Sequence, residues 1–329
     1  GTYASPFDAG TAYVLLHHAF GEVNGKKGVW GHAIGGMGSV SEAIAKAARA
    51  HGADIETGTE ISEVLIERDR AAGISLKDGR VARAPVIAAN MTLKHLYTEL
   101  VAKDALSPAF SERMEHFKYG SGTFRMNVAL SKLPDFECLP GVDPGDHHGA
   151  GIIIGPSLDY MDRAYRDARD HGWSSEPIIE MLIPSTIDPT LAPPGSHVAS
   201  LFCQHVAPAL PGGRSWDEAR DEVADLMIAT VDRYAPGFAK GVIARQVLSP
   251  LDLERTFGLT GGDIFHGQLS LNQLFSARPA LGYAAYRGPI KGLYHCGSGA
   301  HPGGGVTGAP GHNAAHAILR DLRPFSFLS

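Results

Sequence analysis

The stretch that decides the fold is residues 292–316, which read GLYHCGSGAHPGGGVTGAPGHNAAH. It predicts a short strand over residues 293–296, a glycine-crowded turn and a helix that starts near Gly304. Glycine lets a backbone approach an anion closely, and the N-terminus of a helix adds free N–H groups and a positive dipole end. The segment is therefore predicted to hold a phosphate or an anionic ring edge. A tight turn with glycines for packing alone is the alternative.

Residues 303–308 also match the pattern GxGxxG. In a dinucleotide-binding fold this pattern opens a strand–helix–strand unit, and a carboxylate for the ribose follows about 20 residues later. Few residues follow Gly308, and no such unit opens the chain. We therefore expect the chain to be the C-terminal portion of a dinucleotide enzyme, without the N-terminal GxGxxG unit.

The composition limits the class of protein. A length of 329 residues, of which 44% are hydrophobic, suits about two domains. The formal net charge of -6 argues against nucleic acid as a partner, because phosphate binding needs a basic surface. No apolar run is long enough to span a bilayer, so we expect a cytoplasmic protein that at most touches membranes peripherally. The three cysteines are far apart and no histidine pattern matches a zinc motif, so neither a disulfide nor a metal site is expected.

Residues 25–95 have the pattern of a layered α/β block with a small β meander. A helical period of apolar residues gives way to short β-rich runs that are separated by turn residues. The expected elements are a helix capped by Ser39 and Glu42, strands over residues 53–57 and 61–66, a hairpin turn at Asp78-Gly79 and a strand over residues 85–89.

From about residue 96 the apolar residues alternate, which is typical of half-buried strands in a largely antiparallel sheet. Ser215 and Glu218 form a second capping box before a helix with an apolar face. The middle of the chain therefore reads as a separate α+β domain. Four residues are candidates for the lining of a lipophilic tunnel, although an apolar stripe of this kind is usually ordinary core: Phe124, Met126, Phe202 and Phe275.

The quoted stretch resembles the C-terminal flavin signature of the phytoene desaturase-like FAD-dependent oxidoreductases. The resemblance covers essentially the whole chain. Further segments are similar to the branch that includes the pyridine nucleotide-disulphide oxidoreductase domain protein 2 group: residues 30–38, 261–267, 274–279 and 286–290.

The resemblance implies a fold of α/β plus α+β class. It is an incomplete FAD-binding domain of the glutathione-reductase-like kind, with an inserted, largely antiparallel substrate domain. The implied bounds are 1–24 for a linker or substrate-domain segment, 25–95 for the first part of the FAD-binding domain, 96–285 for the substrate domain and 286–329 for the final strand and helix of the FAD-binding domain.

The resemblance also implies which residues contact the cofactor, FAD. Gly36 and Met37 would lie near the ribityl or pyrophosphate group, Ile61 would contact adenine, and Ala89 would line the adenosine. Ser298 stands where many relatives place an acidic residue for a ribityl hydroxyl, and it can still hydrogen-bond. The residues implied around the ribityl chain and the isoalloxazine are Gly297, Ser298, His301, Gly303, Gly304, Gly305 and Val306.

Two histidines are candidate catalytic groups. In flavin dehydrogenation the isoalloxazine accepts the hydride, while the protein supplies placement, electrostatics and water exclusion. His301 and His266 are the candidate polar groups near the reacting atoms, and a structural role in its own turn is the alternative for each. Arg278 is expected to bridge two domains through hydrogen bonds to carboxylate or carbonyl groups.

The sequence therefore favours an FAD-dependent oxidoreductase of dehydrogenase, desaturase or isomerase type. Its substrate would be a hydrophobic small molecule such as an isoprenoid or carotenoid. The alternative is a truncated, non-catalytic fragment that acts as a binding or assembly module without flavin. An uncovered sheet edge would favour a homo-oligomer or pairing with the missing N-terminal segment.

Overall fold

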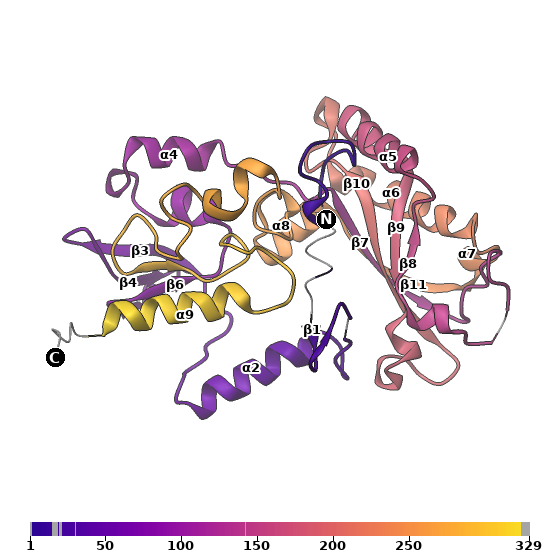
Figure 1. Ribbon diagram of the computed structural model, residues 1–329, viewed down its shortest axis with the longest axis horizontal. Helices are drawn as coiled ribbons and strands as arrows, with labels where there is room; N and C mark the ends of the chain where they lie inside the picture. The colour runs from indigo at the N-terminus through magenta and orange to yellow at the C-terminus, as the bar shows by residue number, and fades with distance from the viewer. Residues whose placement is uncertain (1, 15–18, 20–21, 30, 142, 324–329) are drawn as a thin grey trace. The chain divides into compact units, whose positions relative to one another are not determined.

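The structure is a computed structural model that describes residues 2–14, 19, 22–29, 31–141 and 143–323 (Figure 1). Trp30 and residues 15–18, 20 and 21, which belong to segments discussed above, lie outside the described residues. The chain forms two compact units, each built from two stretches of sequence. We name them the sheet unit, residues 1–55 with 122–252, and the turn unit, residues 56–121 with 253–329.

The sheet unit is organised around a five-stranded antiparallel sheet in the order β11-β7-β10-β9-β8 (Figure 1). The alternation of apolar residues in the middle of the chain is the cause, because it gives each strand one face for a core. The antiparallel sheet expected there is confirmed. Its strands are β7 (Thr123–Leu130), β8 (Ile152–Ile154), β9 (Trp173–Leu182), β10 (His197–Val206) and β11 (Val242–Leu248).

One face of this sheet buries its apolar side chains against α6 (Trp216–Asp232). The expected capping box is confirmed, with the Ser215 hydroxyl accepting from the first turn and the Ser215 N–H donating to Glu218 at 3.2 Å. Phe124 and Met126 are 0% and 1% exposed in this core, so they do not line a tunnel.

The opposite face of the sheet is only partly covered. Helix α5 (Leu158–His171) lies over one end of it, where Tyr160 and Ala164 pack on Ile178 of β9. The tunnel candidate Phe202 lies on this face, half-buried, because it alternates with the core residues of β10. The short helix α7 (Phe238–Gly241) leads into β11.

Helix α2 (Gly38–Ala50) follows a small hairpin of β1 (Glu22–Val23) and β2 (Lys26–Lys27) in the sheet unit. The capping box expected at Ser39 is wrong. The N-cap is Met37, two residues earlier than expected, so Ser39 lies inside the first turn and its hydroxyl donates to the Gly36 carbonyl at 2.7 Å. No residue of α2 is buried, although its apolar positions have helical spacing.

The turn unit contains two small sheets. An antiparallel meander has the expected turn at Asp78, whose carboxylate accepts the N–H of Arg80 at 3.0 Å. A parallel pair joins segments that are far apart in the sequence. The strands are β3 (Ile61–Glu67), β4 (Arg70–Leu76) and β5 (Val81–Arg83) in the meander, with β6 (Ile87–Ala89) and β12 (Leu293–His295) in the pair.

Residues 53–57, all of them described, form no strand, so that expectation is wrong. A strand needs a neighbour for its backbone groups, and these residues pair with no described strand. The remaining α-helices of the turn unit are α3 (Leu93–His95), α4 (Pro108–Glu115) and α9 (Ala309–Leu322), and α8 (Pro250–Phe257) crosses the boundary at residue 252.

The two units are compact groups of residues, each defined by the contacts among its own residues. The domain bounds implied by the resemblance stay a prediction. Within the described residues, every helix is too short or too polar to cross a bilayer.

Candidate cofactor site

The glycine turn begins where β12 ends, at the carboxyl edge of the parallel pair (Figure 1). A Cβ atom on Gly297 would lie only 2.0 Å from Oδ1 of Asn90, the residue that follows β6. A side chain at residue 297 would displace the side chain of Asn90, and its Cβ would lie 3.1 Å from the Asn90 Cα atom. The turn is therefore held against the end of the neighbouring strand, where open α/β folds bind ligands.

The helix after the turn starts later than expected. Helix α9 begins at Ala309, and its N-cap is Gly308 with φ of 68°. Val306 has φ of 54° and Gly305 has φ of 149°, which excludes an α-helix across these positions. The expected start near Gly304 is therefore wrong, and residues 301–307 form a loop.

Packing alone explains part of the glycine content. A Cβ atom on Gly304 would lie 2.8 Å from Cδ1 of Phe265. At Gly299 a Cβ atom would lie 3.0 Å from Cγ of Leu93. The alternative stated for the turn, glycines for close packing, therefore holds at these two positions.

Arg278 holds the glycine turn in place through hydrogen bonds to backbone carbonyl groups. Its guanidinium is fully buried, and it donates to the carbonyl oxygen of Ser298 at 2.7 Å and to that of Phe265 at 2.6 Å. It also donates to the carbonyl oxygens of Gly267 and Gln273. These partners all lie in the turn unit. By the domain bounds implied above, Arg278 and Ser298 belong to different domains, and the expected bridge between domains stays a prediction.

The carboxylate of Asp263 is buried in the same region. It accepts the N–H groups of Gly120 at 2.9 Å and Phe265 at 2.8 Å. Burial raises the pKa of Asp263, while these hydrogen bonds and the charge of Arg278 act in the opposite direction. Arg278 thus braces the loop that carries His266 against the loop that carries Ser298, and Asp263 connects the loop that carries His266 to Gly120.

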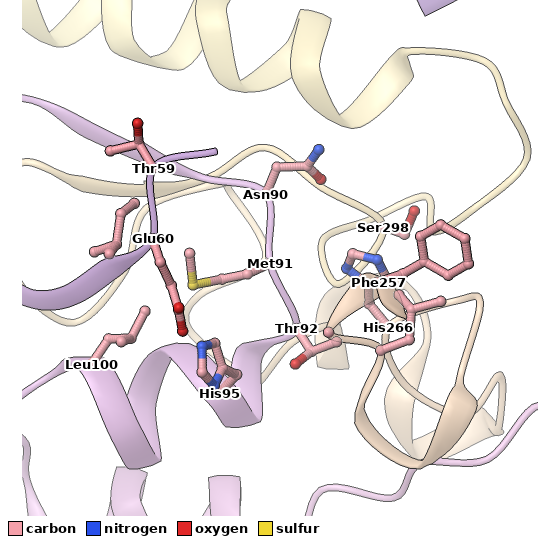
Figure 2. Close-up of a pocket in the computed structure, with 13 residues that line it drawn as sticks. Thr59, Glu60, Asn90, Met91, Thr92, His95, Leu100, Phe257, His266 and Ser298 are labelled. Atoms are coloured by element: carbon pink, nitrogen blue, oxygen red, sulfur yellow. The ribbon is translucent and has the colours of Figure 1, made fainter. Parts of the chain in front are cut away.

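A cavity of about 510 Å³ lies beside this braced turn (Figure 2). Thr59 and Glu60 lie at one end of it, Ser298 and His266 lie at the other, and Asn90 is placed between them. Its lining residues are Thr59, Glu60, Ile61, Asn90, Met91, Thr92, His95, Leu100, Phe257, Gly258, Leu259, His266 and Ser298.

Three residues that the sequence singled out meet at this cavity: Ile61, Ser298 and His266. Ile61 also lines a second cavity of about 290 Å³, and Ala89 lies there with it. The second cavity is apolar. Its other lining residues are Val64, Ile74, Ile87, Ala88, Asn90, Met91, Leu96 and Leu100.

His266 presents a polar atom without a protein partner. Its ring hydrogen-bonds to the backbone of Met91, and burial lowers its pKa. The other ring nitrogen, Nδ1, has no hydrogen-bond partner among the described residues. A neutral imidazole of this kind can accept from or donate to a bound group, which fits a ligand in the cavity.

The remaining predicted residues of the turn do not line the cavity. His301 is half-buried, its ring centroid lies 5.9 Å from that of Phe275, and burial lowers its pKa. Gly303, Gly305 and Val306 belong to the loop that follows, where Val306 is 74% exposed. Their expected contacts with the flavin stay a prediction.

Gly36 and Met37 lie in the sheet unit, on a loop that a buried carboxylate anchors. The carboxylate of Asp188 accepts the N–H of Gly35 at 2.7 Å and both the N–H and the hydroxyl of Thr190. The Thr190 hydrogen bond is the largest of the effects that lower the pKa of Asp188 to about 2. The expected cofactor contacts of Gly36 and Met37 also stay a prediction.

Sequence reasoning missed Asn90, Asp188 and the brace made by Asp263. Asn90 follows a recognised strand, so its place at a strand end was the available signal. Asp188 is far in sequence from Gly35, and nothing in the local pattern connects the two. Among the described residues, no three His, Cys, Asp or Glu side chains gather as metal ligands.

Known proteins resemble the chain both in sequence and in fold. Residues 1–124 match the family of the flavin containing amine oxidoreductases. The chain is 43% identical over 329 residues to pyridine nucleotide-disulfide oxidoreductase domain-containing protein 2 of Mus musculus, and the match covers 98% of this chain and 57% of that protein. It is 25% identical over 340 residues to a phytoene desaturase (lycopene-forming) of Pseudescherichia vulneris, covering 97% of this chain and 61% of that protein.

A solved structure of an oxidoreductase from Methanosarcina mazei aligns with a TM-score of 0.57 at 20% identity, covering 88% of this chain and 55% of that one. The chain thus spans a little more than half the length of the curated relatives it matches. The structural likeness shows the fold, and the expected fold class is confirmed. By sequence, the chain is similar to the flavin-containing amine oxidoreductases over residues 1–124 and to an oxidoreductase domain-containing protein over 98% of its length.

Proposed function

We propose that this chain forms part of an FAD-dependent oxidoreductase that dehydrogenates or isomerises a hydrophobic substrate. The observation that supports the proposal most is the cavity lined by both Ile61 and Ser298 beside the glycine turn. These two residues are the ones that the family resemblance connects with the adenine and the ribityl group. Isoprenoids are the substrate class suggested by the phytoene desaturase relatives.

The residues present fit a flavin in three respects. Gly297, at the end of β12, lies against the Asn90 side chain at the end of β6, so both residues lie at the carboxyl edge of the parallel pair. Nδ1 of His266 is a buried polar atom that lacks a protein partner. The lining of the cavity mixes hydroxyl, amide and apolar groups, as a cofactor with polar and aromatic parts requires.

Each part of the chain would have a different task. When bound, FAD supplies the hydride acceptor. Ser298 would donate a hydrogen bond to a ribityl hydroxyl, and Arg278 would keep the Ser298 backbone in place. His266, held neutral at physiological pH by burial, would orient a polar group without adding charge.

The test is a titration of the protein with FAD, followed by quenching of flavin fluorescence and by the visible absorbance of the protein after gel filtration. We expect saturable quenching and a yellow protein. A colourless protein that leaves flavin fluorescence unchanged, and that contains no flavin when purified from its source, would contradict the proposal.

The competing function is a binding or assembly module without flavin. The observation that favours it is the absence of any buried residue in α2, together with the apolar second cavity. Such surfaces suit pairing with another copy or with a dinucleotide-binding segment. Sedimentation equilibrium over a range of concentrations measures self-association, and a flavin-free oligomer would favour this second function.

A further inference from the structure

The face of the five-stranded sheet that is opposite α6 carries Arg125, a cation that forms no ion pair with the described carboxylates. Arg125 on β7 lies opposite Phe202 on β10, and Phe202 lies opposite Glu180 on β9. On its other side, Arg125 lies opposite Leu248 of β11. These four side chains form a row across the sheet, and all of them are half-buried.

The contacts of Arg125 use little of its hydrogen-bonding capacity. One terminal nitrogen donates to Oγ of Ser200 at 2.8 Å, and the guanidinium lies 5.3 Å from the centroid of the Phe202 ring. A guanidinium carries five N–H donors. None of its nitrogens is among the buried, partnerless polar atoms of the described residues, so the donors without a protein acceptor keep some contact with solvent.

Keeping a cation in this place is costly. Burial lowers the pKa of Arg125, which means that the surroundings disfavour its charge, and Glu180 offsets this only in part. The ring of Phe202 stabilises a guanidinium stacked on it, but a single ring does not replace full hydration. A guanidinium whose charge is disfavoured by burial, and whose remaining donors have no protein acceptor, fits an anionic ligand.

We propose that Arg125 binds the carboxylate of an amphipathic substrate, whose hydrocarbon part packs on Phe202 and Leu248. This inference rests on the proposed function, because it names the substrate class of the same protein. The planar fork of a guanidinium matches a carboxylate through two parallel hydrogen bonds. The apolar neighbours on both sides of Arg125 match a hydrocarbon chain that carries the acid group.

The charges of the row favour a singly charged acid over a phosphate. Glu180 lies two strands away and repels an anion, the more so if the anion carries two charges. The neighbouring cation Arg245 on β11 does not assist, because its ion pairs with Asp225 and Asp221 turn it toward α6. A neutral hydrocarbon would leave the donors of Arg125 without an acceptor.

The experiment is isothermal titration calorimetry of the full chain, without FAD, with octanoate as the probe and 1-octanol as its uncharged counterpart. We expect octanoate to bind at least tenfold more tightly than octanol, since its carboxylate adds a charge and a second hydrogen bond to the guanidinium that the octanol hydroxyl does not supply. Arg125→Gln should lose that tenfold or more, while Arg245→Gln, the matched control on the same sheet, should not.

A second variant keeps the inference testable if Arg125→Gln fails to fold, which its circular dichroism melt would reveal. Glu180→Gln removes the repelling charge and should strengthen octanoate binding by about twofold to fivefold. Equal affinity for octanoate and octanol, or unchanged octanoate binding in a folded Arg125→Gln, would overturn the inference. Failure of the FAD titration alone would overturn the proposed function and leave these binding results standing.

Discussion

Arg278 is the single side chain on which the geometry of the glycine turn depends most. Its buried guanidinium donates to carbonyl groups of both loops beside the cavity and opposes the charge of Asp263. Arg278→Met leaves those carbonyls and that carboxylate without compensation, so we expect a loss of about 3–5 kcal/mol in the free energy of unfolding. Urea unfolding of the two proteins measures it, and a loss below about 1 kcal/mol would show that the brace is dispensable.

Gly297 offers a sharper test of the cofactor site. Gly297→Ala places a methyl group 2.0 Å from Oδ1 of Asn90, so Asn90 must move away from its position on the cavity wall. We expect FAD binding to weaken at least tenfold, measured by fluorescence quenching. Gly38→Ala is the matched control, because its Cβ would meet nothing within 4 Å. Equal FAD affinity in the two variants would remove Gly297 from the site.

Sequence patterns predicted the residues of the turn better than their neighbours. Glycine spacing predicted a turn at the end of the strand, because close backbone approach requires glycine, but it placed the end of that turn near Gly304 instead of Gly308. The buried partners Arg278 and Asp263 act through long-range contacts, which leave no local period. The roles of Ser298 and His266 toward a ligand could not be predicted either, because they depend on which side chains from distant parts of the sequence line the same cavity.

At the scale of elements, α2 differs from the other long helices. Helix α6 buries seven residues, whereas α2 buries none. Ile44, at the centre of α2, is 63% exposed. We expect Ile44→Ser to change the free energy of unfolding by less than about 0.5 kcal/mol. Met227→Ala in α6 should cost about 2–5 kcal/mol, and thermal melts compare the two. A large loss for Ile44→Ser would mean that α2 has a covering partner in solution.

The strands were easier to predict than the helix ends. The alternation of apolar and polar residues predicted β7, β9 and β10, because a two-residue period is typical of a strand with one buried face. The start of α9 was misplaced because three glycines preceded it, and glycine also serves as a loop residue. Residues 53–57 had strand composition but no described strand to pair with, which only the fold reveals.

At the scale of the whole molecule, each unit carries its own buried histidine. Burial lowers the pKa of His205 in the sheet unit to about 3 and that of His295 in the turn unit to about 4. Unfolding restores a pKa near 6.5 to each, so the unfolded chain binds more protons below that pH. Stability is therefore lost as the pH falls from about 6.5 toward about 4, at about 1.4 kcal/mol per pH unit for each histidine.

Urea unfolding at a series of pH values tests this dependence. The free energy of unfolding should fall steadily below pH 6.5 in the wild type, and His205→Gln should flatten the dependence of the sheet unit. His51→Gln, at an exposed helix end, is the control and should leave the slope as it was. A pH profile that His205→Gln leaves unaltered would assign the acid sensitivity to other groups.

The anchoring of the Gly35 loop by Asp188 has a consequence for how the protein responds to pH. Because the pKa of Asp188 is about 2, its carboxylate keeps its negative charge in alkaline, neutral and mildly acidic solutions alike. The loop keeps its tether in all of them. Any response of the protein to the acidity of its surroundings must therefore begin elsewhere in the chain.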